Sequence, residues 1–488
     1  MSNNVQLITY VDRMSGGNLN DLNHVLKSEF PNLFAGIHLL PFYYPIDGSD
    51  AGFDPINHAQ VDPRLGEWSD IRSLGDDYEL MADLIVNHMS AQSEEFKDVL
   101  ENGRDSEFWE LFLTKESVFP DGLSSEHQQT IYRPRPGSCF TEYQLASGET
   151  VEFWTTFTGN QIDINVESIA GKAYLSKILT QFSEANIKMI RLDAAGYAIK
   201  RAGTNCFMLD ETFTFIQQLA AEAKRLGIVT LVEIHSYYQT QIEIAKRVNL
   251  VYDFALPPLI LHTLFKQDAT ALVTWLKKSP KNCITVLDTH DGIGIIDVGP
   301  MDGKPGLLTE EEINDLVETM HQKTNGESLK ATGNAANNVD LYQVNSSYFS
   351  ALGSDPSSYL VARAIQFFAP GTPQVYYGGL LAEDNDMNLL SSSNVGRDIN
   401  RPYLDLVSIK QARNKKVVSG LEKLIRLRNS STAFTGEFSI ENTNDTLIMV
   451  WKNGIETAHL KVEFASLNFT LTLSNGNKTD TYRLEDFN

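Results

Sequence analysis

Eight short apolar runs with β-strand character recur between residues 5 and 377, and amphipathic helical patterns separate most of them. Strands that alternate with helices form parallel sheets through βαβ crossovers. Eight such units predict a closed (β/α)₈ barrel, the TIM-barrel architecture of the α/β class. The runs are VQLIT (5–9), GIHLL (36–40), LMADLIV (80–86), MIRLD (189–193), VTLVE (229–233), LVYDF (250–254), CITVLD (283–288) and QVYY (374–377).

Two of the helical patterns end on residues that tolerate a left-handed backbone. Asn186 stands just before MIRLD, and Gly227 stands just before VTLVE. Asparagine and glycine are the residues that most often close a helix with positive φ. We therefore expect both helices to end in a left-handed turn that leads directly into a barrel strand.

Two segments between strands are too long to be simple connections, because loops beyond about 12–15 residues usually carry structure of their own. They span residues 87–168 and 293–353. Both follow the carboxyl end of a strand, so we expect two inserted subdomains on the barrel face where active sites are built. Within the second, the small and polar run ATGNAANN (331–338) predicts a mobile loop.

The last part of the chain changes to short alternating runs such as LKVEF (460–464) and FTLTL (469–473), with Asn-Gly turn signals. This pattern predicts a small C-terminal all-β domain, either a sandwich or a sheet. The predicted division is a catalytic barrel made of 1–86, 169–292 and 354–432, insertions at 87–168 and 293–353, and a β domain at 433–488.

The charge balance restricts the partners. The formal net charge is −23, and such a field repels nucleic-acid phosphates and anionic membranes. No apolar run approaches the roughly 20 residues of a membrane span, and the N-terminus lacks a signal-peptide pattern, so we expect a cytoplasmic protein. Cys139, Cys206 and Cys283 show no C-x-x-C spacing, which favours buried, reduced thiols.

Polar residues recur at the carboxyl ends of four predicted strands. Carboxyl ends of barrel strands converge on one face, so these side chains should meet in one pocket. They are Asp83 and His88 around DLIVNH, Arg191 and Asp193 in MIRLD, Glu233 and His235 in VTLVEIH, and His290 and Asp291 after TVLDT.

Three of these carboxylates, Asp193, Glu233 and Asp291, suit glycoside chemistry, in which one carboxylate attacks the anomeric carbon and another protonates the leaving oxygen. A metal-dependent hydrolase that uses the three histidines is the alternative. The chain has no H-E-x-x-H motif, and Arg191 beside Asp193 would repel a cation. We therefore predict an enzyme without a metal or a cofactor.

The same motifs carry a resemblance to a known family. DLIVNH, IRLDA, VEIH and LDTHD are similar, in order and spacing, to the four signature regions of the α-amylase family of retaining α-glucoside enzymes. Longer stretches resemble its glucoside phosphorylase branch, typified by the sucrose phosphorylases: DGSDAGFDPINHAQVDPRLGEW, IYRPRPG, VYDFALPPL, THDGIGIIDVG, DLYQVNSSYFSALG and GRDINR. The resemblance covers about residues 5 to 430, and we expect the remainder to be shorter than is usual in the branch.

The resemblance implies the phosphorolysis of sucrose to α-glucose 1-phosphate and fructose by a double displacement with inorganic phosphate. Asp193 matches the nucleophile, Glu233 the acid/base, and Asp291 the carboxylate that holds the 2- and 3-hydroxyls of glucose. It also implies a glucose subsite that ends at Asp50 and Arg397, which grip the 4- and 6-hydroxyl end.

Two sets of binding residues follow from the matched motifs. For the glucose subsite they are Asp50, Phe53, His88, Phe157, Arg191, Tyr197, His290 and Arg397. For the fructose and phosphate subsite, where the family exchanges two loops, they are Pro134, Arg135, His235, Asp340, Leu341, Tyr342 and Gln343.

Several alternatives stay open at this point. Related phosphorylases that act on sucrose 6′-phosphate, glucosylglycerol or glucosylglycerate share the catalytic residues, and a sucrose hydrolase would use water in the second step. A catalytically silent sugar-binding relative would lack the carboxylates. Amylase-like folds can hold calcium near Asn87, although this branch does not resemble a calcium-dependent one. The sequence does not decide between a monomer and a homodimer.

Overall fold

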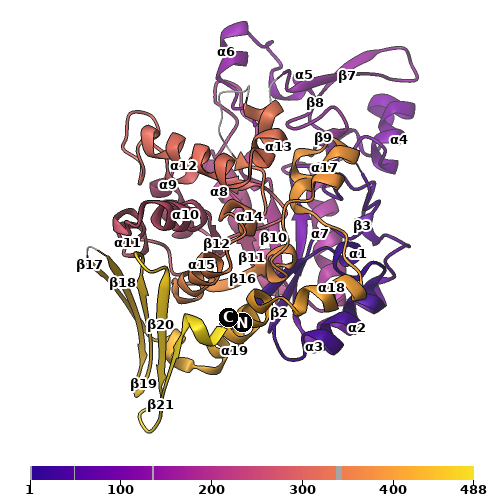
Figure 1. Cartoon of the computed structure of the whole chain (residues 1–488). Coiled ribbons are helices and arrows are strands. Elements are labelled where there is room, and N and C mark those ends of the chain that lie inside the picture. The colour runs from indigo at the N-terminus through magenta and orange to yellow at the C-terminus, as the bar shows by residue number, and fades with distance from the viewer. Residues whose placement is uncertain (1–2, 49, 135–136, 337–342, 444, 488) are drawn as a thin grey trace.

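The fold is a closed barrel of eight parallel strands, as predicted (Figure 1). This computed structural model describes residues 3–48, 50–134, 137–336, 343–443 and 445–487. The barrel strands are β1 (Gln6–Thr9), β2 (Gly36–Leu39), β5 (Glu79–Ile85), β10 (Ile187–Asp193), β11 (Val229–Val232), β12 (Leu250–Asp253), β13 (Cys283–Thr285) and β16 (Thr372–Tyr376). Each coincides with one of the eight predicted runs, so the (β/α)₈ prediction is confirmed.

Closure of the barrel is made by β1, which pairs in parallel with β2 on one side and with β16 on the other. Gln6 lies opposite Gly36 and Gln374, and the Gln374 amide donates to Gln6 at 2.8 Å inside the barrel. A Cβ at Gly36 would lie 2.7 Å from the carbonyl oxygen of Glu79, so this crowded seam requires glycine.

Helices cover the outside of the barrel and bury apolar faces against it. The main ones are α2 (Leu19–Glu29), α3 (Trp68–Asp77), α7 (Ile169–Glu184), α8 (Asp210–Arg225), α9 (Tyr238–Ala245), α10 (Leu256–Lys266), α11 (Thr270–Leu276), α15 (Pro356–Phe368), α18 (Leu406–Arg413) and α19 (Lys416–Ser430). Asn186 follows α7 with φ 63°, and Gly227 follows α8 with φ 77°. Both predicted left-handed turns are therefore confirmed.

The first long insertion leaves the barrel after β5 and returns at α7. It holds β6 (His88–Ser90), α4 (Glu94–Asn102), α5 (Lys115–Val118), α6 (Ser125–Thr130), β7 (Phe140–Gln144), β8 (Thr150–Trp154) and β9 (Gln161–Asp163). Phe96 packs edge-on against Phe112 and Phe153, which gives the insertion an aromatic core of its own. Its first and last strands, β6 and β9, pair antiparallel, so the segment is closed at its base.

The second insertion follows β13 and forms a helical layer beside the first (Figure 1). It contains β14 (Ile293–Gly294), α12 (Glu310–Lys323), α13 (Glu327–Ala336), β15 (Gln343–Val344) and α14 (Tyr348–Ala351). The prediction of a mobile loop over 331–338 is wrong for residues 331–336, which continue α13. Alanine has the highest helix propensity, and this outweighs the small, polar appearance of the run. Residues 337 and 338 lie outside the described part of the chain.

The C-terminal region is one antiparallel sheet whose strands follow one another in chain order. Of the two predicted forms, a sandwich or a sheet, the structure has the sheet. Its strands are β17 (Glu437–Thr443), β18 (Thr446–Asn453), β19 (Glu456–Glu463), β20 (Asn468–Ser474) and β21 (Thr479–Arg483). Leu447, Met449 and Trp451 alternate inward along β18, and the Trp451 indole donates to the carbonyl oxygen of Phe368 at 2.8 Å. This bond ties the sheet to α15 of the barrel.

Other sequence expectations concern cysteines and membrane spans. Cys139, Cys206 and Cys283 are free and buried, as predicted. No helix in the described ranges combines the length and the apolar character that crossing a bilayer requires. The domain boundaries stated above remain a proposed division.

A buried ammonium group joins the first insertion to the barrel. The side chain of Lys200 is 1% exposed, and its Nζ contacts Asp163 Oδ2 at 2.5 Å and Asn87 Oδ1 at 2.8 Å. It also donates to the carbonyl oxygen of Tyr197, four residues after the end of β10. Amylase-like folds can hold a calcium ion near the position of Asn87. In this chain the ammonium group of Lys200 supplies the positive charge beside Asn87.

We predict that Lys200→Met lowers the free energy of unfolding by about 3–5 kcal/mol, because it leaves the carboxylate of Asp163 buried without its cation. The measurement is urea denaturation followed by circular dichroism. Lys177→Met, at an exposed position of α7, is the matched control and should change stability by no more than about 0.5 kcal/mol. Equal stability of the two variants would contradict a structural role for Lys200.

Candidate active site

Three strand ends supply the carboxylates of the site. Asp193 is the last residue of β10, Glu233 follows β11 directly, and Asp291 lies six residues beyond β13. The chain turns sharply after Asp193, because Ala194 adopts a left-handed conformation with φ 54° and ψ 23°. A non-glycine residue in this region stores strain, typically of order 1–3 kcal/mol, which folded structures retain mostly at functional positions.

A buried arginine holds two of these carboxylates. The side chain of Arg191 is 3% exposed, and its Nη2 lies 3.1 Å from Asp193 Oδ1 and 3.4 Å from Glu233 Oε1. Its Nη1 contacts Asp83 Oδ1 at 2.7 Å. The register of the sheet sets this last contact, because Arg191 of β10 lies opposite Asp83 of β5. One guanidinium therefore connects a structural carboxylate to two carboxylates that face the pocket.

Burial and charged neighbours act on the protonation of Asp193. Burial raises the pKa of Asp193 well above its usual value, Arg191 opposes this rise, and Glu233 adds to it. Asp193 and Glu233 lie against the same guanidinium. Two carboxylates this close favour a state that holds one proton between them. Such a pair can act as one nucleophile and one acid.

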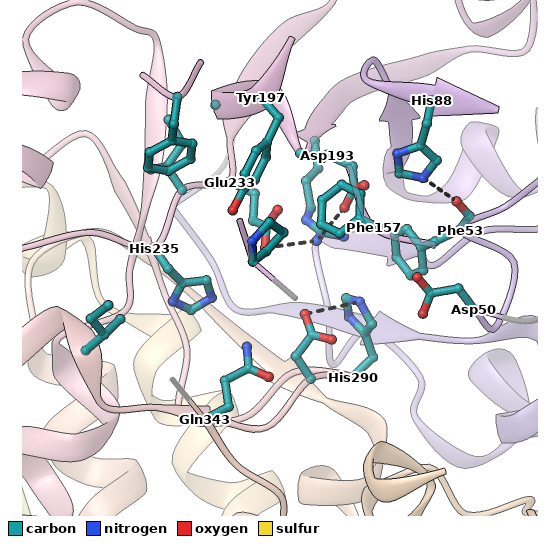
Figure 2. Close-up of a pocket in the computed structure, with 18 of the residues that line it drawn as sticks. Asp50, Phe53, His88, Phe157, Asp193, Tyr197, Glu233, His235, His290 and Gln343 are labelled. Carbon is teal, nitrogen blue, oxygen red and sulfur yellow. Dashed lines mark hydrogen bonds and ion pairs between the residues drawn. The ribbon is translucent and has the colours of Figure 1, made fainter. Parts of the chain in front are cut away.

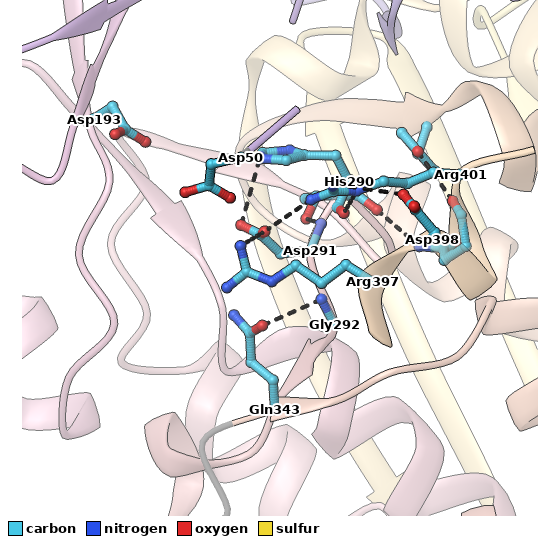
Figure 3. Close-up of polar contacts among 12 residues, drawn as sticks. Asp50, Asp193, His290, Asp291, Gly292, Gln343, Arg397, Asp398 and Arg401 are labelled. Atoms are coloured by element: carbon cyan, nitrogen blue, oxygen red, sulfur yellow. Dashed lines mark hydrogen bonds and ion pairs between the residues drawn. The ribbon is translucent and has the colours of Figure 1, made fainter. Parts of the chain in front are cut away.

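Asp291 lies in a separate cationic cluster (Figure 3). Its Oδ1 is 2.7 Å from Arg397 Nη1 and 3.7 Å from Arg401 Nη2, and its Oδ2 is 3.5 Å from His290 Nε2. Burial alone would raise the pKa of Asp291, but the guanidiniums of Arg397 and Arg401 hold it well below its usual value. Burial also lowers the pKa of His290 to about 3. Asp291 is therefore an anion and His290 a neutral ring at neutral pH.

Aromatic and histidine rings form the wall around the carboxylates (Figure 2). Phe53 stacks on His290 with centroids 4.8 Å apart, and the Arg191 guanidinium lies 5.3 Å from the centre of the Phe53 ring. Phe157 meets His88 and Tyr197 edge-on at 5.2 and 5.3 Å. Flat apolar faces beside polar groups suit the alternating surfaces of a sugar ring.

The opposite side of the pocket is lined by residues of the two insertions and of the segments that follow β10 and β11. Gln343 accepts a hydrogen bond at 3.2 Å from the backbone amide of Gly292, beside Asp291. Tyr132 stacks on Phe207 with centroids 4.4 Å apart. His235 Nδ1 lies 3.0 Å from Asp297 Oδ2, and its ring stacks on Phe254 at 3.8 Å. This side has fewer carboxylates than the strand-end side.

The structure brings the predicted residues together. They line a cavity of about 160 Å³, below the range of roughly 300–1,000 Å³ typical of drug-sized ligands, which suits a small ligand. Those lining it are Asp50, Phe53, His88, Pro134, Phe157, Arg191, Asp193, Tyr197, Glu233, His235, His290, Asp291, Gln343 and Arg397. Asp83, which was also expected in the pocket, does not line it, because its carboxylate is buried against Arg191 and His38. The other predicted residues, Arg135, Asp340, Leu341 and Tyr342, lie outside the described part of the chain.

Sequence reasoning missed six further lining residues. They are Tyr132, Ala194, Gly196, Phe207, Ile234 and Ile296. Tyr132 lies within the quoted IYRPRPG motif, and its place in that motif could have indicated it. Ile296 likewise lies within the quoted THDGIGIIDVG motif. Phe207 carries no local signal, because a single apolar residue in a loop resembles any core residue.

The metal alternative finds no support in the arrangement of the histidines. Among the described residues, no group of three or more His, Cys, Asp or Glu side chains is placed to hold a metal ion. His88 contacts the carbonyl oxygen of Phe53, while His235 and His290 contact Asp297 and Asp291, so the three rings have separate partners.

Comparison with known proteins agrees with this geometry. Residues 33–401 match the α-amylase catalytic-domain family. A sucrose phosphorylase of Agrobacterium vitis is 55% identical over 97% of this chain and 98% of its own length, and one of Bifidobacterium adolescentis is 48% identical over 95% and 92%. The crystal structure of sucrose 6F-phosphate phosphorylase from Thermoanaerobacter thermosaccharolyticum matches with a TM-score of 0.91 and 36% identity, over 99% of this chain and 98% of that chain.

The extent of these matches corrects one expectation. Because the Agrobacterium vitis protein is covered over 98% of its length, the C-terminal region of this chain is not short in comparison with it. That region forms one five-stranded sheet. The chain therefore belongs to the α-amylase family, in the branch that contains the sucrose phosphorylases.

Proposed function

We propose that this protein is a retaining glucoside phosphorylase that converts sucrose and inorganic phosphate to α-glucose 1-phosphate and fructose. The observation that carries the proposal is the placement of Asp193 and Glu233 on one buried guanidinium, at the base of a small pocket. The similarity to sucrose phosphorylases over nearly the whole chain supports this choice of substrate.

The spacing of the two carboxylates favours retention of configuration. Asp193 Oδ1 and Glu233 Oε1 can be no farther apart than the sum of their contacts to Arg191 Nη2, 3.1 and 3.4 Å. Inverting enzymes separate their carboxyl groups by roughly 6.5–9.5 Å, whereas retaining enzymes place them about 5–5.5 Å apart. The largest possible distance between Asp193 Oδ1 and Glu233 Oε1 therefore only reaches the smallest separation found in inverting enzymes.

In the first step, a carboxylate oxygen of Asp193 attacks C1 of the glucosyl unit. The bond from C1 to the fructosyl oxygen breaks, and Glu233 transfers its proton to that oxygen, which releases fructose. In the second step, a phosphate oxygen attacks C1, the ester to Asp193 breaks, and Glu233 accepts the proton of the phosphate. Two inversions at C1 give α-glucose 1-phosphate.

The glucosyl unit would be held by the strand-end side of the pocket. Asp291, kept ionised by Arg397 and Arg401, is suited to accept hydrogen bonds from two sugar hydroxyls and to stabilise positive charge at C1. Asp50 and Arg397 line the end of this side, so we expect one terminal glucosyl unit to fill it. Phe53 offers its ring face to the apolar side of the sugar.

The acceptor side would receive fructose and then phosphate. Pro134, His235 and Gln343 line it. From the family resemblance we also propose Arg135, Asp340, Leu341 and Tyr342 for this subsite. Related phosphorylases that use a different acceptor remain the second candidate, because one of the similar structures is that of a sucrose 6F-phosphate phosphorylase.

The proposed activity is tested by incubating the purified protein with sucrose and inorganic phosphate. We expect the amount of fructose to equal that of glucose 1-phosphate and free glucose together, with free glucose as the minor product. A parallel reaction with sucrose 6′-phosphate should be slower, since the described pocket has no cluster of cations around its acceptor side. Release of glucose alone would point to a hydrolase, and a preference for the phosphorylated sugar would point to the related enzyme.

The role of Asp193 is tested by Asp193→Ala. We expect the rate of glucosyl transfer to fall by about 10⁴-fold or more, because the ester intermediate cannot form. Mass spectrometry of the unchanged enzyme, acid-quenched during turnover, should find a glucosyl adduct on the peptide that contains residue 193. An adduct on another peptide, or a variant that retains a tenth of the activity, would overturn this assignment.

The role of Glu233 is tested by Glu233→Gln with two donors. We expect a loss of about 10²–10⁴-fold with sucrose, whose fructosyl oxygen must be protonated as it leaves. With α-glucosyl fluoride the loss of fluoride release should be much smaller, since fluoride leaves without full protonation. Equal losses on both donors would show that Glu233 is not the acid.

A further inference from the structure

The acceptor side of the pocket must attract phosphate within a strongly acidic protein. The net charge is −23, and four carboxylates, Asp50, Asp193, Glu233 and Asp291, line the same cavity. Among the described lining residues, the two arginines contact these carboxylates: Arg191 lies against Asp193 and Glu233, and Arg397 against Asp291. A positive charge on the acceptor side therefore has to come from other groups: Arg135, which the family resemblance proposes and which lies outside the described residues, and a group among the described residues.

His235 is placed to supply it. Its ring lies beside the acceptor side of the cavity, between Glu233 and Gln343 (Figure 2). The side chain is 5% exposed, and Nδ1 lies 3.0 Å from Asp297 Oδ2. The ring also stacks on Phe254 with an interplanar angle of 12° and a centroid distance of 3.8 Å. Two independent contacts thus fix the plane of the imidazole.

Asp297 is anchored by the segment that carries His235. Its carboxylate is fully buried, and Oδ1 accepts from the backbone amide of Ser236 at 3.0 Å and from Gln241 Nε2 at 2.5 Å. Gly294 makes room for this arrangement, since a Cβ there would lie 3.0 Å from Asp297 Oδ2 and 3.1 Å from His235 Cε1. The second insertion therefore supplies a carboxylate built to hold one histidine.

The charges around the ring favour its protonated form. Burial alone would lower the pKa of His235, but Asp297 at hydrogen-bonding distance raises it, and Glu233 and Asp291 add to the rise. The net pKa lies above the ordinary value. When one imidazole nitrogen donates to a carboxylate, the protonated ring can donate from the other as well.

We propose that Asp297 is a positioning residue for the second half-reaction: it holds His235 as a cationic hydrogen-bond donor on the acceptor side, so that phosphate is bound in preference to water. The inference rests on the proposed phosphorolysis and assigns a role that the catalytic carboxylates do not fill. A hydrogen bond between charged partners is roughly twice as strong as a neutral one, and water gains no such advantage. Asp297 and His235 together thus distinguish phosphate from water by charge.

The test is Asp297→Asn. The amide oxygen can keep the contacts to Ser236 and Gln241, whereas the amide nitrogen now faces His235 Nδ1 and favours the neutral ring. With α-glucosyl fluoride as donor, both products of the glucosyl enzyme are measured while phosphate is varied. We expect the phosphate concentration that gives equal glucose and glucose 1-phosphate to rise by about 10-fold or more. An unchanged concentration would overturn the proposal.

Gln241→Met is the matched control. It removes one contact to Asp297 and disturbs the same turn, but leaves the carboxylate facing His235. We expect its partition between phosphate and water to stay within about 3-fold of that of the unchanged enzyme. A shift in this partition as large as that of Asp297→Asn would show that the effect comes from a disordered turn. It would then contradict a role for the charge on His235. If Asp297→Asn does not fold, His235→Gln removes the same cation and must show the same loss of preference.

The pH profile provides a readout that a purely structural role would not change. Because the pKa of His235 is raised, the cation is present below that pKa and is lost as the pH rises through it. The ratio of phosphate capture to hydrolysis should fall through this range in the unchanged enzyme, and the fall should move to lower pH in Asp297→Asn. Comparing the two proteins at each pH cancels the titration of phosphate itself.

Identical pH profiles would overturn the inference and leave the proposed phosphorolysis intact. If the unchanged enzyme formed no glucose 1-phosphate at any phosphate concentration, both proposals would fall together. One set of assays therefore distinguishes the two failures. If only the Asp297 inference fails, both proteins still transfer the glucosyl group to phosphate. If the proposed phosphorolysis fails, the unchanged enzyme does not.

Discussion

The site depends on one buried guanidinium. Arg191 is almost fully enclosed, and taking a charge out of water costs several kcal/mol unless partners compensate it. Asp83 on the neighbouring strand provides that compensation at 2.7 Å, and the pKa of Asp83 is held at about 2, by Arg191 first and His38 second, against the effect of burial. The remaining donors of Arg191 then reach the pocket. Because β5 and β10 set this pairing through their register, the rigid barrel determines where the carboxylates lie.

The chemistry is divided between two kinds of structure. Strand ends of the barrel carry the carboxylates and hold them within hydrogen-bonding reach of fixed partners, which suits groups that must be placed to within a fraction of an ångström. The insertions supply the acceptor side through Gln343, the Tyr132–Phe207 stack and the Asp297 that contacts His235. Lys200 joins the two parts, since it follows β10 of the barrel and its ammonium contacts Asn87 and Asp163 of the first insertion. Arg191 and Lys200 are thus two cations that this acidic protein places in its interior, where they contact carboxylates.

The barrel could be predicted because strand and helix patterns have different periods, and each of the eight runs is short, apolar and bounded by turn signals. The strand-end residues followed from the same pattern, since their position relative to a strand is local information. Asp50 and Arg397 could be placed in the pocket only through the family resemblance, because long-range packing brings these loops together. Asp297 was missed although it lies in the quoted THDGIGIIDVG stretch, since a buried partner for His235 has no local pattern. The helix over 331–336 was missed because polar composition was read without alanine's helix propensity.

The two outcomes of the glucosyl enzyme share every step at Asp193 and Glu233. Water and phosphate attack the same carbon, break the same ester and deliver a proton to the same carboxylate, so neither catalytic group can distinguish them. Discrimination must therefore arise from contacts that only the acceptor makes. A neutral pocket would favour water, which is small and far more concentrated than phosphate. A buried cation changes this balance only if it stays charged and oriented, and a fully buried carboxylate 3.0 Å from the imidazole satisfies both conditions. In this fold the catalytic carboxylates determine that a glucosyl group is transferred, and the acceptor side determines whether phosphate or water receives it.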